Sequence, residues 1–147
     1  MENKTIYTEI ITDHNVDPYH KHEIEGANLI LEGVNPSCGD DITLSLKVED
    51  DVVVDGAYQG VGCAISQASA DIMLDLVIGK TKDEALRLSD LFLNMIRSEI
   101  TEEELEELEE AGLLKDIAHN PSRTKCAVLG WRTLREMFGV EFEYEEE

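Results

Sequence analysis

The stretch that decides the fold lies at residues 41–61 and reads DITLSLKVEDDVVVDGAYQGV. Its first part alternates apolar and polar side chains, with Ile42, Leu44, Leu46 and Val48 in every second position. Since successive side chains of a strand point to opposite faces, this pattern predicts a strand with one buried face. Residues 52–61 are rich in valine and predict a second strand. Glu49-Asp50-Asp51 fits a tight turn between the two, which predicts an antiparallel hairpin.

The sequence on either side of this hairpin predicts one more strand and several helices. Residues 27–33 contain three consecutive aliphatic side chains and complete a small three-stranded sheet. The predicted helices, separated by polar loops such as residues 13–25, cover residues 4–14, 64–78, 81–95, 101–110 and 121–138. Capping boxes open two of them, at Thr81 and Thr101. Because most of the helices follow the strands, we expect an α+β fold: a small antiparallel sheet with helices packed on one face.

The composition limits the classes of function. The chain of 147 residues carries 12 Lys and Arg against 33 Asp and Glu, a net charge of −21. Such a surface repels nucleic acid and anionic membranes, so neither is an expected partner. Neither a secretory signal nor a transmembrane helix is evident, so we expect a cytoplasmic protein with its three cysteines reduced. We expect residues 1–147 to form a single domain, whose acidic tail at residues 141–147 is disordered.

The cysteines lie at the junctions between predicted elements. Cys38 falls in the turn-forming string NPSCGD at residues 35–40, Cys63 precedes a helix, and Cys126 lies in the first turns of the last helix. Asp40 is two residues from Cys38 and can point toward the same atom, with Gly39 allowing the backbone to bend. Three thiolates and one carboxylate would suit zinc or an iron–sulfur cluster at one end of the fold. The spacing by itself leaves scattered structural cysteines equally open.

Three motifs resemble those of one known family. Residues 35–40 (NPSCGD), 60–66 (GVGCAIS) and 123–127 (RTKCA) are similar, in this order, to the three cysteine motifs of the NifU N-terminal/IscU/SufU family. Asp13-His14 followed by Pro18 resembles the end of the family's N-terminal helix, and the likeness extends from about Ile6 to Phe138. The resemblance implies a protein of iron–sulfur cluster assembly with one metal site, made of Cys38, Asp40, Cys63 and Cys126.

Two features resemble the SufU type of this family. Lys125 stands immediately before the third cysteine, where the IscU type has a histidine, and residues 98–120 resemble the SufU-type insertion. The resemblance implies that zinc is bound by the four ligands and that Cys38 accepts persulfide sulfur from a SufS-type cysteine desulfurase. It also implies a downstream iron–sulfur scaffold or apoprotein as recipient, and a supporting role for Arg123. Residues 19–22 (YHKH) depart from the family's usual sequence, which puts the local partner contacts in question.

Two other functions stay open from the same residues. The ligands could instead hold a [2Fe–2S] cluster that is built on the protein and handed on, or a zinc ion that serves structure alone. For His20 and His22, for His119 and for the acidic helix at residues 101–110, we expect exposed surface positions rather than binding sites.

Overall fold

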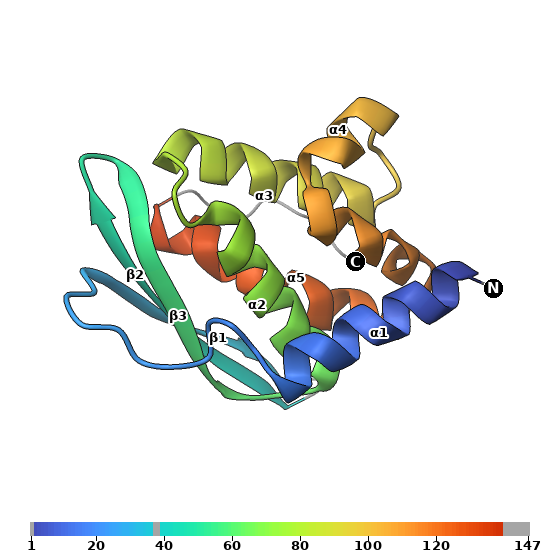
Figure 1. Ribbon diagram of the computed structural model, residues 1–147, viewed down its shortest axis with the longest axis horizontal. Helices are drawn as coiled ribbons and strands as arrows, with labels where there is room; N and C mark the ends of the chain where they lie inside the picture. The colour runs from blue at the N-terminus through green and yellow to red at the C-terminus, as the bar shows by residue number, and fades with distance from the viewer. Residues whose placement is uncertain (1, 37–38, 140–147) are drawn as a thin grey trace.

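The computed structural model describes residues 2–36 and 39–139, with side chains described from residue 9 onward (Figure 1). Cys38 and the tail at residues 141–147 lie outside these ranges. The α-helices are α1 (Glu2–Val16), α2 (Ala64–Val77), α3 (Lys82–Ile96), α4 (Glu102–Glu107) and α5 (Pro121–Met137). A 3-10 helix, η1 (Glu109–His119), follows α4, and the strands are β1 (Leu29–Asn35), β2 (Asp40–Glu49) and β3 (Val52–Val61).

As predicted, the three strands form an antiparallel sheet, and their order in it is β1-β2-β3. Asp50 and Asp51 join β2 to β3 with φ angles of 54° and 67°. Two central residues with positive φ match the strand twist of a two-residue hairpin, and aspartate is among the residues that tolerate this conformation. The prediction for β1 is wrong at both ends, because the strand begins at Leu29 and continues to Asn35, which the sequence placed in a turn.

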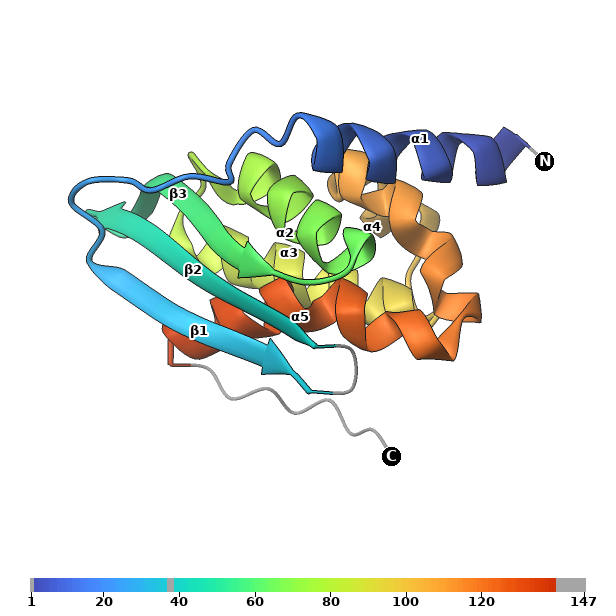
Figure 2. The same cartoon turned by 90° about the horizontal axis from the view of Figure 1, so that it is seen from below.

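The helices pack on one face of the sheet, which confirms the expected α+β architecture (Figure 2). The alternating residues Ile42, Leu44 and Leu46 of β2 are fully buried beneath them. Helix α5 contacts β1 and β2, while α2 contacts β3. Within the described ranges, no helix combines the length and the apolar character needed to cross a membrane.

The pair α2–α5 forms the centre of the core. Ser69 of α2 donates a 2.6 Å hydrogen bond to the carbonyl of Ala127 and accepts one of 3.0 Å from the indole N–H of Trp131. The Trp131 ring also stacks on Phe92 of α3, with ring centroids 4.2 Å apart. Residues on three helices are therefore joined by one buried tryptophan, which fixes how α2 and α5 lie against each other.

Helix α1 is longer than predicted and is held to α2 by polar contacts. It continues to Val16, so His14 lies inside the helix, buried against the carboxylate of Asp71 at 2.5 Å. The other ring nitrogen of His14 lies 3.2 Å from Glu110. Asn15 donates a 2.9 Å hydrogen bond to the carbonyl of Ala64, the first residue of α2. Helix α1 thus ends beside the N-terminus of α2.

The acidic helix predicted at residues 101–110 is shorter than expected. The capping box at Thr101 is present, but α4 ends at Glu107, and Glu109 adopts a positive φ of 52° before η1 begins. Here the chain turns back on itself, because Gly112 packs against Leu105. Leu108, Leu114 and Ile117 are buried, whereas the glutamates of α4 face outward or lie at the boundary. The buried apolar residues attach the segment to the core.

Candidate metal centre

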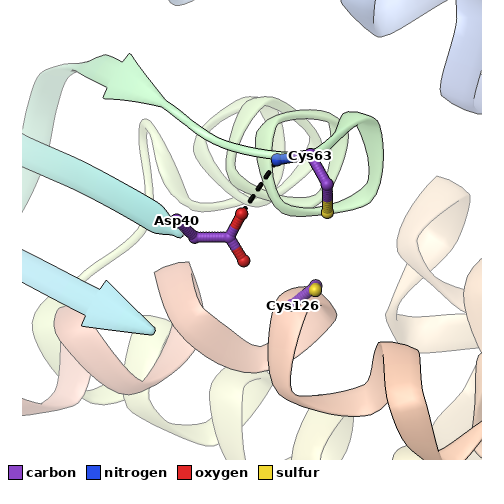
Figure 3. Close-up of side chains that lie close together, drawn as sticks. All are labelled: Asp40, Cys63 and Cys126. Carbon is purple, nitrogen blue, oxygen red and sulfur yellow. Dashed lines mark hydrogen bonds between the residues drawn. The ribbon is translucent and has the colours of Figure 1, made fainter. Parts of the chain in front are cut away.

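Three side chains that are far apart in the sequence meet at one end of the sheet (Figure 3). Asp40, Cys63 and Cys126 each offer one ligand atom, and these atoms all lie within 4.8 Å of one another. They come from the start of β2, the residue before α2, and the second turn of α5. The convergence expected for these three residues is therefore present, and it depends on the packing of α5 against α2.

Asp40 is fully buried and is held by hydrogen bonds. Its Oδ1 accepts the backbone N–H of Cys63 at 2.8 Å, and its Oδ2 lies 3.3 Å from the side-chain nitrogen of Asn35. A buried carboxylate must be hydrogen-bonded or paired, since burial of an isolated charge is very costly. These contacts orient the carboxylate at the point where β2 and the chain before α2 meet.

Cys63 is the N-cap residue of α2, which agrees with its predicted position directly before a helix. Its backbone is extended (φ −72°, ψ 168°), and its Sγ accepts the N–H of Ser66 at 3.4 Å. A side chain at Gly62, the preceding residue, would displace these groups, because a Cβ there would lie 2.7 Å from Asp40 Oδ1 and 2.6 Å from Ser66 Oγ.

Cys126 is fully buried in the second turn of α5. The amide nitrogen of Asn35 lies 3.9 Å from its Sγ. Arg123 and Lys125, which precede it on the same helix, are exposed. Their positive charges lie on the outer side of the first turns, where they can offset part of the negative charge of a thiolate-rich centre.

The remaining candidate residues are Cys38 and the histidines His20 and His22. Cys38 lies outside the described residues, and Gly39 beside it has a φ of +74°, the bend that glycine permits. His20 Nε2 lies 3.3 Å from the Asp75 carboxylate, and His22 contacts the carbonyl of Glu23. Among the described residues, Asp40, Cys63 and Cys126 form the one group of metal-binding side chains close enough to share an ion, and it contains no histidine.

Asn35 is the residue near the centre that sequence reasoning missed. Asn-Pro-Ser is a typical turn sequence and predicts a turn position for Asn35, yet Asn35 is the last residue of β1 and is buried. A signal was present, because Leu29, Leu31, Gly33 and Asn35 occupy alternate positions and therefore share the face of the sheet that is covered by helices.

The donor set fits a zinc ion or an iron–sulfur cluster. Thiolates and carboxylates bind zinc at about 2.3 Å and about 2.0–2.2 Å, which places ligand atoms of one tetrahedral ion about 3.5–4 Å apart. The ligand atoms of Asp40, Cys63 and Cys126 all lie within 4.8 Å of one another, which is close to this spacing. Two sulfurs and one oxygen leave one position of a tetrahedral ion open for a fourth ligand.

Comparison with known proteins agrees with the motifs. The family model described as NifU-like N terminal domain matches residues 6–139 of this sequence. A protein of Thermotoga maritima named iron–sulfur cluster assembly scaffold protein IscU is 43% identical over 90% of this chain and 92% of its own. The zinc-dependent sulfurtransferase SufU of Bacillus subtilis is 33% identical over 90% and 88%.

A solved structure extends the likeness to the fold. The protein FiSufU of Fervidobacterium islandicum, assigned as an iron–sulfur cluster assembly scaffold for the SUF system, superimposes with a TM-score of 0.80. It is 39% identical, and the match covers 90% of this chain and 96% of that one. The family model covers nearly the whole chain, and all three of these relatives are at least 33% identical over 90% of it. The chain therefore belongs to the NifU N-terminal family of iron–sulfur cluster assembly proteins, together with IscU and SufU.

Proposed function

We propose that this protein is a SufU-type sulfur acceptor: it takes persulfide sulfur from a SufS-type cysteine desulfurase at Cys38, in a zinc centre completed by Asp40, Cys63 and Cys126. The observation that carries the proposal is the convergence of the last three residues within 4.8 Å. A group of two cysteines and an aspartate, contributed by three separate elements and with Asp40 and Cys126 buried and Cys63 partly buried, is the donor set of a metal centre rather than of an ordinary core.

Lys125 favours the sulfur-transfer role over the scaffold role. It is exposed at the position before Cys126 where scaffolds of the IscU type carry a histidine. An ammonium group has no lone pair to offer a metal, so Lys125 cannot provide the additional ligand that the histidine could. The relative from Bacillus subtilis, which is named a zinc-dependent sulfurtransferase, supports the same choice. Residues 98–120, here α4 and η1 with their flanking turns, would be the SufU-type insertion.

The proposed transfer is a thiol–persulfide exchange. The Cys38 thiolate attacks the outer sulfur of the desulfurase persulfide, a new S–S bond forms at Cys38, and the old S–S bond breaks. The desulfurase cysteine leaves as a thiolate, and the terminal sulfur keeps its proton. Zinc would hold the ligand cysteines as thiolates at neutral pH and is itself redox-inactive. Asp40 and Cys63 stay fixed by their hydrogen bonds, while Arg123 on the exposed first turn of α5 would support the approaching persulfide.

The setting of this reaction follows from the same proposal. The sulfur would pass to an iron–sulfur scaffold or an apoprotein, and the reaction would take place in the cytoplasm, where thiols stay reduced. A surface with a net charge of −21 favours partners with basic docking surfaces.

Substitution of Cys38 tests the proposal directly. We expect Cys38→Ala to fold normally and to abolish the stimulation of desulfurase turnover, because the attacking thiolate is gone. Ser37→Ala, a change at the neighbouring residue, is the matched control and should retain full stimulation. Sulfide release by the desulfurase and the zinc content of each variant are measured together. Stimulation by Cys38→Ala at the wild-type level would refute the role of this cysteine.

Assembly of a [2Fe–2S] cluster on the same residues is the second candidate function. The name of the Thermotoga maritima relative, an assembly scaffold, favours it. Metal analysis and an absorption spectrum of anaerobically purified protein separate the two. Stoichiometric zinc without visible bands supports sulfur transfer, whereas brown protein containing labile sulfide supports the scaffold.

A further inference from the structure

Asn35 lies between two of the three described ligand residues. It is 7% exposed, ends β1, and pairs with Asp40 across the sheet. Its Nδ2 lies 3.3 Å from Asp40 Oδ2 and 3.9 Å from Cys126 Sγ. One amide group therefore reaches a ligand from β2 and a ligand from α5.

The chemistry of the neighbours requires a donor at this place. A carboxylate oxygen and a thiolate sulfur are both acceptors, so the amide must turn its NH₂ group toward them and its carbonyl oxygen away. An amide meets this need without adding charge. A carboxylate of the same shape would provide no donor and would add a negative charge to a centre that is already acidic.

The two oxygens of Asp40 are held from opposite sides. Oδ1 accepts the backbone N–H of Cys63, and Oδ2 accepts the amide of Asn35. Each carboxylate oxygen has two lone pairs, so one remains on each oxygen for a metal ion. With both oxygens anchored, the plane of the carboxylate is set before any ion binds.

We propose that Asn35 is a positioning residue of the metal centre, which orients the Asp40 carboxylate and holds it in register with Cys126 Sγ. The inference rests on the proposed function only in taking Asp40 and Cys126 as metal ligands; it does not depend on sulfur transfer. Partners that orient a metal ligand in this way typically change metal affinity by about 10–100-fold when they are removed.

Zinc affinity measured by competition with a chromogenic chelator tests the proposal. We expect Asn35→Ala to bind zinc about 10–100-fold more weakly than the wild type. Asn35→Asp should be weaker still, because it adds charge and removes the donor. The matched control is Asn28→Ala. Asn28 directly precedes β1 at the end away from the centre, and its side chain exchanges two hydrogen bonds with the backbone of Val48. This control should keep wild-type zinc affinity even if it melts at a lower temperature.

A spectroscopic measurement separates positioning from a general effect on the fold. Cobalt(II) replaces zinc and absorbs according to its ligand geometry, so Asn35→Ala should shift the visible bands of the cobalt protein and Asn28→Ala should not. In an Asp40→Asn background, Asn35→Ala should have a much smaller effect on affinity, because its main partner is already altered.

These measurements distinguish a failure of the proposed function from a failure of the positioning role of Asn35. If the wild type binds neither zinc nor cobalt, the proposed function is wrong and the positioning role falls with it. If the wild type binds and Asn35→Ala equals it in affinity and spectrum, only the role of Asn35 is refuted. If Asn35→Ala fails to fold, Asn35→Ser replaces it; failure of both to fold would show that Asn35 serves the fold itself and would also overturn the proposal.

Discussion

The helix pair α2–α5 and the segment α4–η1 are held in the molecule in different ways. The pair is joined by buried contacts: Ser69 bonds to the Ala127 carbonyl and to Trp131, and a Cβ at Gly130 would be in van der Waals contact with Ala70, at 3.4 Å. The segment contributes a row of buried apolar side chains, but its polar contacts are largely exposed, such as that between Arg87 and Glu107.

This difference in packing determines which elements can hold the candidate metal ligands at fixed distances from one another. Cys63 caps α2 and Cys126 lies on α5, so the distance between their sulfurs depends on the packing of the pair. None of the three described residues of the candidate metal centre lies on α4 or η1. The pair therefore sets the geometry of the centre, whereas the segment can change in stability without moving a ligand.

The largest expected effect is that of Trp131→Ala. Removing a fully buried tryptophan costs about 3–5 kcal/mol, through lost burial and the cavity that is left. Ser69 also loses a hydrogen-bond partner, so the packing of α2 against α5 changes. Zinc affinity should therefore fall as well. Chemical denaturation of the metal-free protein and zinc competition measure the two effects.

Trp131→Phe separates the two contributions of this residue. It keeps a ring to stack on Phe92 but loses the N–H that Ser69 accepts, so its stability should lie between those of the wild type and Trp131→Ala. Wild-type zinc affinity in a folded Trp131→Ala protein would contradict the view that the helix pair sets the ligand geometry.

A smaller effect is expected from Thr101→Ala, which removes the capping box of α4. Thr101 Oγ1 accepts the N–H of Glu104, and the Glu104 carboxylate accepts the N–H of Thr101. Loss of such a cap costs about 1 kcal/mol. Because the segment carries none of the described ligands, zinc affinity should stay at the wild-type value.

Thr81→Ala is the matched control, since Thr81 forms the same capping box with Glu84 at the start of α3. The two variants should lose similar stability by thermal denaturation. A drop in zinc affinity for Thr101→Ala and not for Thr81→Ala would show that α4 supports the centre after all.

Much of the fold could be predicted because its signals are local. The alternation in residues 41–49, the turn at Asp50-Asp51 and the capping boxes at Thr81 and Thr101 all act within a few residues. The end of α4 at Glu107 could not be predicted in this way. It depends on the chain folding back so that Gly112 meets Leu105, a contact with no signature in a helical pattern of glutamate and leucine.

The candidate site shows the same limit. The cysteine motifs indicated Asp40, Cys63 and Cys126 from sequence, but the contact of Asn35 with Cys126 joins residues 91 positions apart. The buried pair His14–Asp71, 57 positions apart, was missed for the same reason. The roles of Cys38 and Arg123, the single domain, the insertion at residues 98–120 and the disordered tail stay predictions.

The smallest expected effect concerns the ion pair between α3 and α4. The Arg87 guanidinium donates to both carboxylate oxygens of Glu107, at 3.1 Å and 2.8 Å, and these hydrogen bonds lower the pKa of the Glu107 carboxyl. A lowered pKa in the folded state means that the pair stabilises the fold above the unfolded-state pKa of about 4.3. This contribution is lost as the pH falls through the folded-state pKa, and salt weakens it because both groups are exposed.

Glu107→Gln tests this pair only against a control for total charge. In a chain with a net charge of −21, removal of any carboxylate relieves repulsion and can stabilise the fold. Glu106→Gln, on the exposed surface of the same helix, measures that general gain. At neutral pH and low salt, Glu107→Gln should be less stable than Glu106→Gln, and the difference should shrink in high salt. Equal stability of the two variants at low salt would mean that the ion pair adds nothing to the attachment of α4, which would then rest on the buried leucines alone.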